Sequence, residues 1–190
     1  MSQTIIGFDI GIKNFAYCII KKENTAVNII ALENIDLQCR KYETQKIIDA
    51  IIDLLDDIFY NQLEKLNSNK IHVIIESQMT SIMKCIQTVV NTFFKMQKKY
   101  QNINIETKYV SAKHKLNLID KYKDKYEGHS NILNTAYRQN KIDSVHFAKW
   151  LIQNESKYYN EIIIQKFETT KKCDDLADAL LMSIYFTESL

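Results

Sequence analysis

The first third of the chain alternates apolar and polar positions with the period of strands. Two β-branched runs, IIGFDI and FAYCII, lie between Thr4 and Lys21 and are separated by GIKN, which is the pattern of a hairpin. A third strand is predicted at about Val27 to Leu32. The pattern then changes from period two to the helical period. From Tyr42 to Leu66, apolar residues recur at i, i+3, i+4 and i+7 with acids on the other face, so an amphipathic helix is predicted.

The remaining pattern predicts two more strands, each followed by helical sequence. IHVIIE, from Ile71 to Glu76, is too short and too β-branched for a helix, and it is typical of a strand buried on both faces. The other predicted elements are a helix at about Ser81 to Tyr100, a strand at Ile103 to Val110, helices at Lys113 to Tyr126, Lys141 to Gln153 and Asp174 to Thr187, and a polar loop at Gly128 to Thr135. We therefore expect an α/β protein with a mixed five-stranded sheet, its first three strands antiparallel, flanked by helices.

Composition narrows the class of protein. A length of 190 residues with 46% hydrophobic content suits one domain, residues 1–190, with one sizeable core. The four cysteines and four histidines lack the spacing of a zinc site. We find neither a signal-peptide pattern nor an apolar run long enough for a membrane span, so we expect a soluble, intracellular protein without a membrane partner.

Charge is unevenly distributed although the net charge is only +2. Thirteen basic and five acidic residues lie between Ser77 and Lys149, and such a basic segment suits a surface that binds phosphates. Lysine-rich helices that are simply well solvated would give the same pattern. Charge alone therefore does not decide between nucleic-acid binding and solubility.

Asp9 is the first candidate for chemistry because it lies in the middle of an apolar strand. An ionised carboxylate is costly to bury there unless it meets a partner or a metal ion. Alternation places Gly7 and Gly11 on the same face, which would leave room for a ligand or a phosphodiester backbone. A structural ion pair is the alternative interpretation.

Three more acids extend this candidate site. Glu76 ends its strand as a carboxylate at the edge of a buried sheet, although many strands end in a solvated Glu. In DDLADALLMSIYF, Asp175 and Asp178 lie one turn apart on a face that continues through Met182 and is buried farther along. Acids are also common in first helical turns because the macrodipole favours them, and Asp174 is predicted to be the N-cap.

Four converging acids repel one another unless cations neutralise them. All-oxygen ligands favour Mg²⁺, with Mn²⁺ as a substitute, over zinc. Two such ions, about 3.5–4 Å apart, activate a water and stabilise the leaving oxygen in phosphodiester hydrolysis. The sequence therefore predicts a metal-dependent nuclease whose ligands are Asp9, Glu76, Asp175 and Asp178.

These segments resemble one known family. GFDIGIKNFAYCI, IIESQ and KCDDLADALL, in this order over nearly the whole chain, are similar to motifs of the RuvC-like Holliday junction resolvases, especially the poxvirus-type enzymes of large DNA viruses. The resemblance implies an RNase H-like fold, the same four metal ligands, a homodimer and no small-molecule cofactor. It also implies paired symmetric nicks in four-way DNA junctions, in a viral factory in the cytoplasm or in the nucleus of a host cell.

The resemblance further implies a catalytic cation near the scissile phosphate. The segment YRQNKIDSV points to Lys141, and Lys115 is the competing candidate. The helix from Ser81 to Tyr100 carries lysines and an apolar patch, so it could line a DNA path and pair two subunits, or be an ordinary core helix with a solvated edge. The candidate DNA contacts are Lys84, Lys95, Lys98, Lys99, Lys113, His114 and Arg138.

Other functions are compatible with parts of this pattern. An actin-like ATP-binding domain also begins with a strand, Asp and Gly, but its phosphate loops need more than the three glycines of this chain. A catalytically silent nucleic-acid-binding module would not need all four acids. An RNase H-like nuclease acting on an RNA–DNA hybrid or a flap stays open as an alternative.

Overall fold

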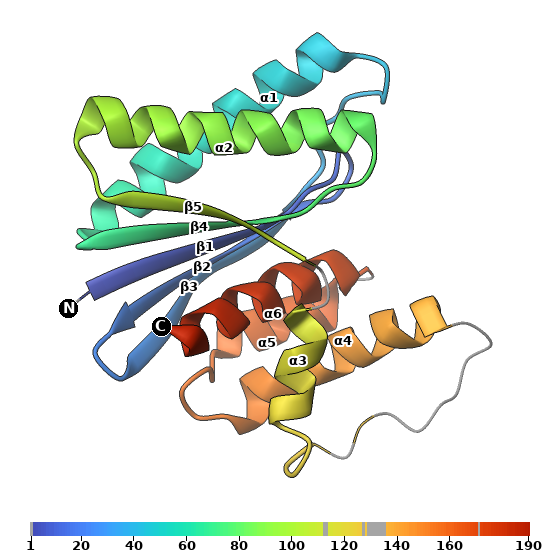
Figure 1. Ribbon diagram of the computed structural model, residues 1–190. Coiled ribbons are helices and arrows are strands. Elements are labelled where there is room, and N and C mark those ends of the chain that lie inside the picture. Colours follow the sequence, from blue (N-terminus) through green and yellow to red (C-terminus); the bar gives the residue numbers. More distant parts are fainter. Residues whose placement is uncertain (1, 112–113, 127, 129–135, 171) are drawn as a thin grey trace.

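The computed structural model describes residues 2–111, 114–126, 128, 136–170 and 172–190 (Figure 1). Within its helices, the side chains of residues 114–116, 136–138 and 140 are not described. The predicted loop from Gly128 to Thr135 lies outside the described residues except for Gly128.

A mixed five-stranded sheet forms the centre of the fold, as the sequence predicts. Its strands are β1 (Ser2–Asp9), β2 (Phe15–Glu23), β3 (Ala26–Ile35), β4 (Lys70–Glu76) and β5 (Ile105–Val110), in the spatial order β3-β2-β1-β4-β5. The first three strands pair antiparallel, whereas β4 lies parallel to β1 and β5 lies parallel to β4. The carboxyl ends of β1, β4 and β5 consequently meet at one edge of the sheet.

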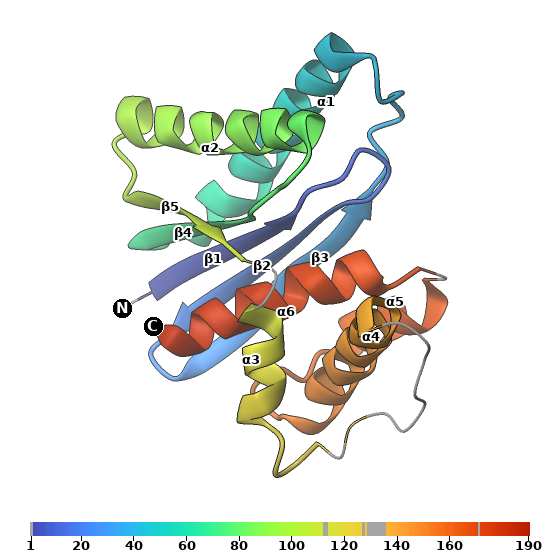
Figure 2. The ribbon, with the colours of Figure 1, turned by 45° about the vertical axis from the view of Figure 1, so that its right-hand side comes forward.

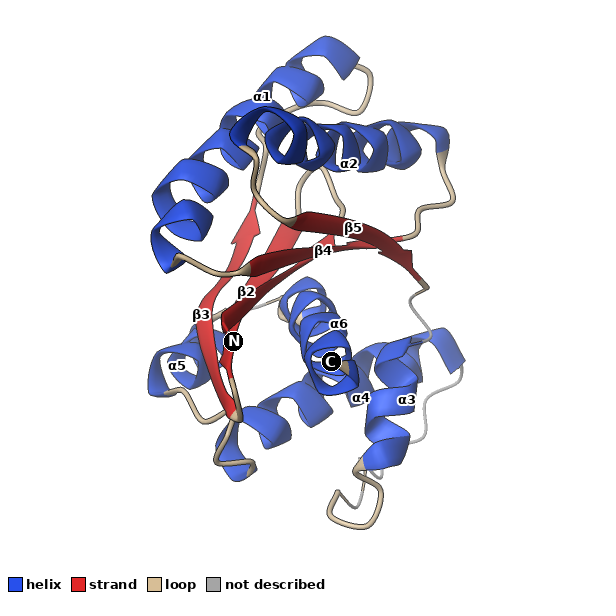
Figure 3. Ribbon diagram, turned by 60° about the vertical axis from the view of Figure 1, so that its left-hand side comes forward, coloured by secondary structure: helices blue, strands red, loops and turns tan. Residues whose placement is uncertain are grey.

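Helices cover both faces of this sheet (Figures 1 and 3). One face carries α1 (Thr44–Asp57) and α2 (Ser81–Gln101), and the other carries α3 (His114–Lys121), α4 (Ala136–Asn154), α5 (Glu161–Thr169) and α6 (Asp174–Ser189). The helix predicted from Tyr42 to Leu66 begins at Thr44, and after α1 it continues as a π-helical segment (Ile58–Leu63) and a 3-10 turn (Glu64–Leu66). Among the described helices, none is long and apolar enough to span a membrane.

Alternation along the strands divides the interior into two hydrophobic cores. In β1, Ile6 and Phe8 pack into the core under α1 and α2, whereas Ile5 packs into the core around α6. Because side chains alternate across a strand, Asp9 points to the same face as Ile5. In β4, Glu76 has the parity of Ile74, which also belongs to the α6 core. Both strand-borne acids are therefore directed toward α6.

Helix α6 is the element that completes this face. It crosses β1 and β2 and packs against α4 on its other side (Figure 2). Its buried residues occur on most of the helix circumference and include Leu176, Leu180, Ser183 and Ile184. A helix enclosed in this way keeps a fixed position relative to the sheet, because both of its neighbours restrain it.

Two helices differ from the sequence prediction. Helix α4 begins at Ala136, earlier than the predicted Lys141, and α5 was not predicted. The signals for α5 are present but short: Asn160 caps the helix by accepting a hydrogen bond from the Ile163 backbone N–H (3.2 Å), and Ile163 and Phe167 are buried one turn apart. Nine residues give only two turns of amphipathic pattern, which periodicity does not detect reliably.

Glu188 fastens the end of α6 to the neighbouring helices. Its Oε1 accepts hydrogen bonds from Tyr158 Oη (2.6 Å) and Lys157 Nζ (2.7 Å), and Tyr122 and Lys121 also donate to this carboxylate. Burial raises the pKa of Glu188, but these four donors lower it further, to about 2. The ionised form is therefore the one that the folded state stabilises.

Glu188→Gln should lower the stability of the protein at pH 7 by about 2–3 kcal/mol, because it replaces a charged acceptor of four donors with a neutral amide. For a chain of this size the expected fall in Tm is about 4–12 °C. Since the pKa is lower in the folded state, this contribution is present above about pH 4.5 and is lost as pH falls toward 2. Thermal unfolding at pH 7 and pH 3 measures it. The exposed control Glu64→Gln should change little, and an undiminished difference at pH 3 would contradict this account.

Candidate active site

Asp9 and Glu76 stand at the carboxyl ends of two adjacent parallel strands. The register pairs Phe8 with Ile75, so the two acids follow as neighbours across β1 and β4. Their side chains share a hydrogen bond, and both residues are half-buried. A hydrogen bond between two carboxyl groups requires a proton on one of them. In the metal-free protein this pair therefore holds one proton between two acids.

The first turn of α6 brings Asp175 and Asp178 to the same place. Acids are favourable at this end of a helix because of its macrodipole. Burial, the Glu76 hydrogen bond and the charges of Glu76, Asp178 and Asp175 together raise the pKa of Asp9 to about 9. The structure thus brings together all four carboxylates that the sequence singled out.

The described side chains do not yet form a ready-made metal site. Among the described residues, no three His, Cys, Asp or Glu side chains are gathered closely enough to hold an ion. Mutual repulsion explains this spacing, because charged carboxylates separate unless a cation lies between them. The donor set nonetheless fits Mg²⁺ or Mn²⁺, since it is all oxygen and comes from rigid elements.

Lys172 neutralises part of this charge. Its Nζ lies 2.9 Å from Asp175 Oδ2 and 3.9 Å from Asp174 Oδ2. With the Asn14 amide oriented so that both of its atoms are satisfied, its oxygen also accepts from Lys172 Nζ (2.9 Å). Lys172 therefore ties the β1–β2 turn to the start of α6. The sequence analysis did not single out this residue, although its spacing of three residues from Asp175 is a visible signal for an ion pair.

The glycines near Asp9 do not leave room for a ligand, so this expectation is wrong. A Cβ at Gly7 would lie 2.2 Å from Ser183 Oγ and 3.3 Å from the Ala179 carbonyl oxygen, and one at Gly11 would lie 2.4 Å from the Asn14 carbonyl oxygen. Helix α6 and the β1–β2 turn occupy that space. Gly7 allows α6 to approach β1 closely, and this approach brings Asp178 near Asp9.

The two candidate catalytic cations differ in what the structure describes. Lys141, in α4, donates to Asp174 Oδ2 (2.6 Å), one residue before the metal-ligand candidate Asp175. Burial raises the pKa of Asp174, but Lys141 lowers it more. Asp174 is the first residue of α6 and not its N-cap, which is Cys173. Lys115 lies in α3, and its side chain is not described.

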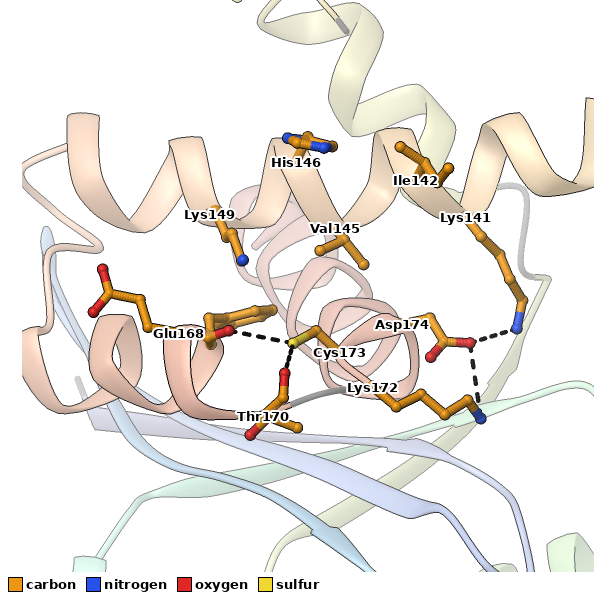
Figure 4. Close-up of a pocket in the computed structure, with 11 residues that line it drawn as sticks. Lys141, Ile142, Val145, His146, Lys149, Glu168, Thr170, Lys172, Cys173 and Asp174 are labelled. Atoms are coloured by element: carbon orange, nitrogen blue, oxygen red, sulfur yellow. Dashed lines mark hydrogen bonds and ion pairs between the residues drawn. The ribbon is translucent and has the colours of Figure 1, made fainter. Parts of the chain in front are cut away.

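A pocket adjoins this site between α4 and the turn that joins α5 to α6 (Figure 4). We call it the α4 pocket, and its volume is about 410 Å³. Its lining residues are Lys141, Ile142, Val145, His146, Lys149, Phe167, Glu168, Thr170, Lys172, Cys173 and Asp174.

The predicted DNA contacts are spread over the molecule. Lys84 lies near the start of α2, whereas Lys95, Lys98 and Lys99 lie toward its other end, with about 22 Å of helix between Lys84 and Lys99 at 1.5 Å per residue. Lys113 lies outside the described residues, and the side chains of His114 and Arg138 are not described. These assignments stay predictions.

Comparison with known proteins identifies the fold. No protein-family model and no curated protein matches the chain by sequence. Among solved structures, the chain is similar to a yeast mitochondrial Holliday junction resolvase (19% identity, 96% of this chain and 76% of that chain, TM-score 0.65). It is also similar to the fowlpox virus Holliday junction resolvase (24% identity, 98% and 99%, TM-score 0.57) and to Thermus thermophilus RuvC (9% identity, 98% and 96%, TM-score 0.55). The chain has the RNase H-like fold of these resolvases, as its sequence predicts.

Proposed function

We propose that this protein is a Holliday junction resolvase, an endonuclease that makes paired symmetric nicks in four-way DNA junctions with Mg²⁺. The observation that carries the proposal is the meeting of Asp9, Glu76, Asp175 and Asp178 at one edge of the sheet, with enough mutual repulsion to raise the pKa of Asp9 to about 9. The likeness in fold to three resolvases over nearly the whole chain supports it.

Each proposed site residue has a distinct task. Two bound Mg²⁺ ions would activate a water and stabilise the leaving oxygen of the cleaved phosphodiester. Asp9 and Glu76 hold the ions from the rigid strand ends, and Asp175 and Asp178 hold them from the first turn of α6. Lys141 is proposed to approach the scissile phosphate as a positive charge, since Asp174 already holds its ammonium group beside the carboxylates. Lys115 stays the alternative for this task.

Paired nicks require two active sites, so we propose that the protein acts as a homodimer. An apolar pocket of about 440 Å³ lies between α1 and α2 on the outer surface, lined mainly by Ile48, Ile52, Val89, Phe93 and Met96. Ile52 and Met96 are exposed. A large apolar surface on a chain of this size suits a subunit interface. Both copies would then present their carboxylate sites to the arms of one junction.

The proposed activity predicts a clear order of substrates. We expect purified protein with Mg²⁺ to cut a four-way junction at symmetric positions, and to cut a duplex of the same sequence at least about tenfold more slowly, because a linear duplex does not engage two active sites in the way a branch does. Cleavage is measured on end-labelled strands with an RNA–DNA hybrid included. Preferential cutting of the hybrid would make the protein a ribonuclease, and no cutting of any substrate would exclude the nuclease proposal.

A further inference from the structure

The α4 pocket combines an apolar wall with a cationic rim. Val145 and Phe167 contribute to the wall, and Lys141, Lys149 and Lys172 approach the pocket from α4 and from the start of α6. Its volume of about 410 Å³ falls within the range of about 300–1,000 Å³ that is usual for small-ligand sites. The pocket is therefore large enough to receive a group of the size of one nucleotide.

Lys149 is the lysine of this rim that lacks a counter-ion. It is half-buried, its side chain extends from α4 toward the turn that carries Cys173 (Figure 4), and among the described residues no carboxylate lies within 4.0 Å of its Nζ. Glu168 also lines the pocket, but in Figure 4 its carboxylate points away from Lys149. A half-buried ammonium group without a counter-ion attracts an anion.

The other two lysines of the rim are already paired with acids of the candidate active site. Lys141 and Lys172 both contact Asp174, and Lys172 also contacts Asp175. Asp174 lines the pocket and Asp175 is a proposed metal ligand, so the pocket begins where the metal site ends. A DNA strand with its scissile phosphate at the four carboxylates would place an adjacent nucleotide at this opening.

We propose that the α4 pocket binds one unpaired nucleotide of the DNA strand that is cut, next to the scissile phosphate. This inference rests on the proposed nuclease function. Lys149 holds the phosphate of that nucleotide, and Val145 and the edge of Phe167 contact its base. A base within a duplex is stacked and paired and enters such a pocket only after unpairing, whereas a base at a branch point is already partly free. The pocket thereby favours branched over linear DNA.

Binding without metal tests this subsite separately from cleavage. In EDTA, Lys149→Met should weaken the binding of a fluorescent six-nucleotide oligothymidylate about five- to tenfold, as measured by anisotropy, because one buried phosphate contact is lost. The slope of log K against log salt should fall by about 0.7, the value for one phosphate on a single strand. Lys149→Arg should keep most of the affinity. A fully paired duplex should bind wild type and Lys149→Met equally.

Lys65→Met is the matched control, because Lys65 is an exposed lysine after α1 on the opposite side of the sheet. It should leave oligothymidylate binding within about twofold of wild type. The subsite is refuted if Lys149→Met binds like Lys65→Met, if duplex and single strand lose affinity equally, or if wild type does not bind the oligonucleotide. Failure of the nuclease proposal would instead appear as no cleavage by wild type with Mg²⁺, whatever the anisotropy shows.

Discussion

Asp175→Asn should reduce junction cleavage about 1,000-fold or more, which corresponds to about 4 kcal/mol of lost transition-state stabilisation. Asparagine keeps the size of the side chain but offers no negative charge to a divalent cation. Junction binding measured in EDTA should be unchanged or slightly tighter, since one negative charge near the phosphates is removed. Single-turnover cleavage of a labelled junction, together with anisotropy, separates the two effects.

Asp56→Asn is the matched control, because Asp56 is exposed in α1 on the far side of the sheet. It should cut junctions as wild type does. A second measurement does not depend on activity: Mn²⁺ should raise the Tm of wild type and of Asp56→Asn more than that of Asp175→Asn, because ligands stabilise the state that binds them. Cleavage by Asp175→Asn within tenfold of wild type would show that the metal site lies elsewhere.

Gly7→Ala should destabilise the protein by about 1–3 kcal/mol and lower Tm by about 2–12 °C. The added Cβ would lie 2.2 Å from Ser183 Oγ and 3.3 Å from the Ala179 carbonyl oxygen, so α6 must shift away from β1. The same shift moves Asp178 away from Asp9, and we expect cleavage to fall at least about tenfold in the protein that stays folded at low temperature. Thermal unfolding and single-turnover cleavage measure the two losses.

A double-mutant cycle identifies the contact responsible. Ser183→Ala removes the Oγ that the new methyl group would meet, so Gly7→Ala should cost less stability in the Ser183→Ala background than in wild type, with a coupling energy of at least about 0.5 kcal/mol. The Ala179 carbonyl stays in place, and recovery is therefore partial. Strictly additive effects would mean that α6 and β1 are not in the close contact described here.

Residue pattern was sufficient to predict the sheet and the four acids. The period-two alternation of β1 places Asp9 on a buried face, and such a face accommodates a carboxylate only with a special partner. The first turn of α6 is equally informative, because Asp175 and Asp178 share a face with the buried Met182. These signals are local and were legible before the structure was known.

Features that depend on close approach were not predictable in the same way. The spacing of Gly7 and Gly11 was interpreted as room for a ligand, although α6 and the β1–β2 turn fill that space. Lys172 was overlooked because its contact with Asn14 joins segments that are distant in the chain. Helix α5 is short, and its cap at Asn160 identifies it only once Ile163 is known to be helical. Each of these depends on tertiary packing, which periodicity does not encode.

The proposed metal ligands lie near opposite ends of the chain, on β1 and α6, which has a consequence during synthesis. While the chain grows from its N-terminus, β1 and β4 can pair long before the residues of α6 leave the ribosome. Until α6 docks, Asp9 and Glu76 lack their two partner acids. A partly synthesised chain can therefore bind DNA through its lysines but cannot cut it, so cleavage activity is delayed until folding is complete.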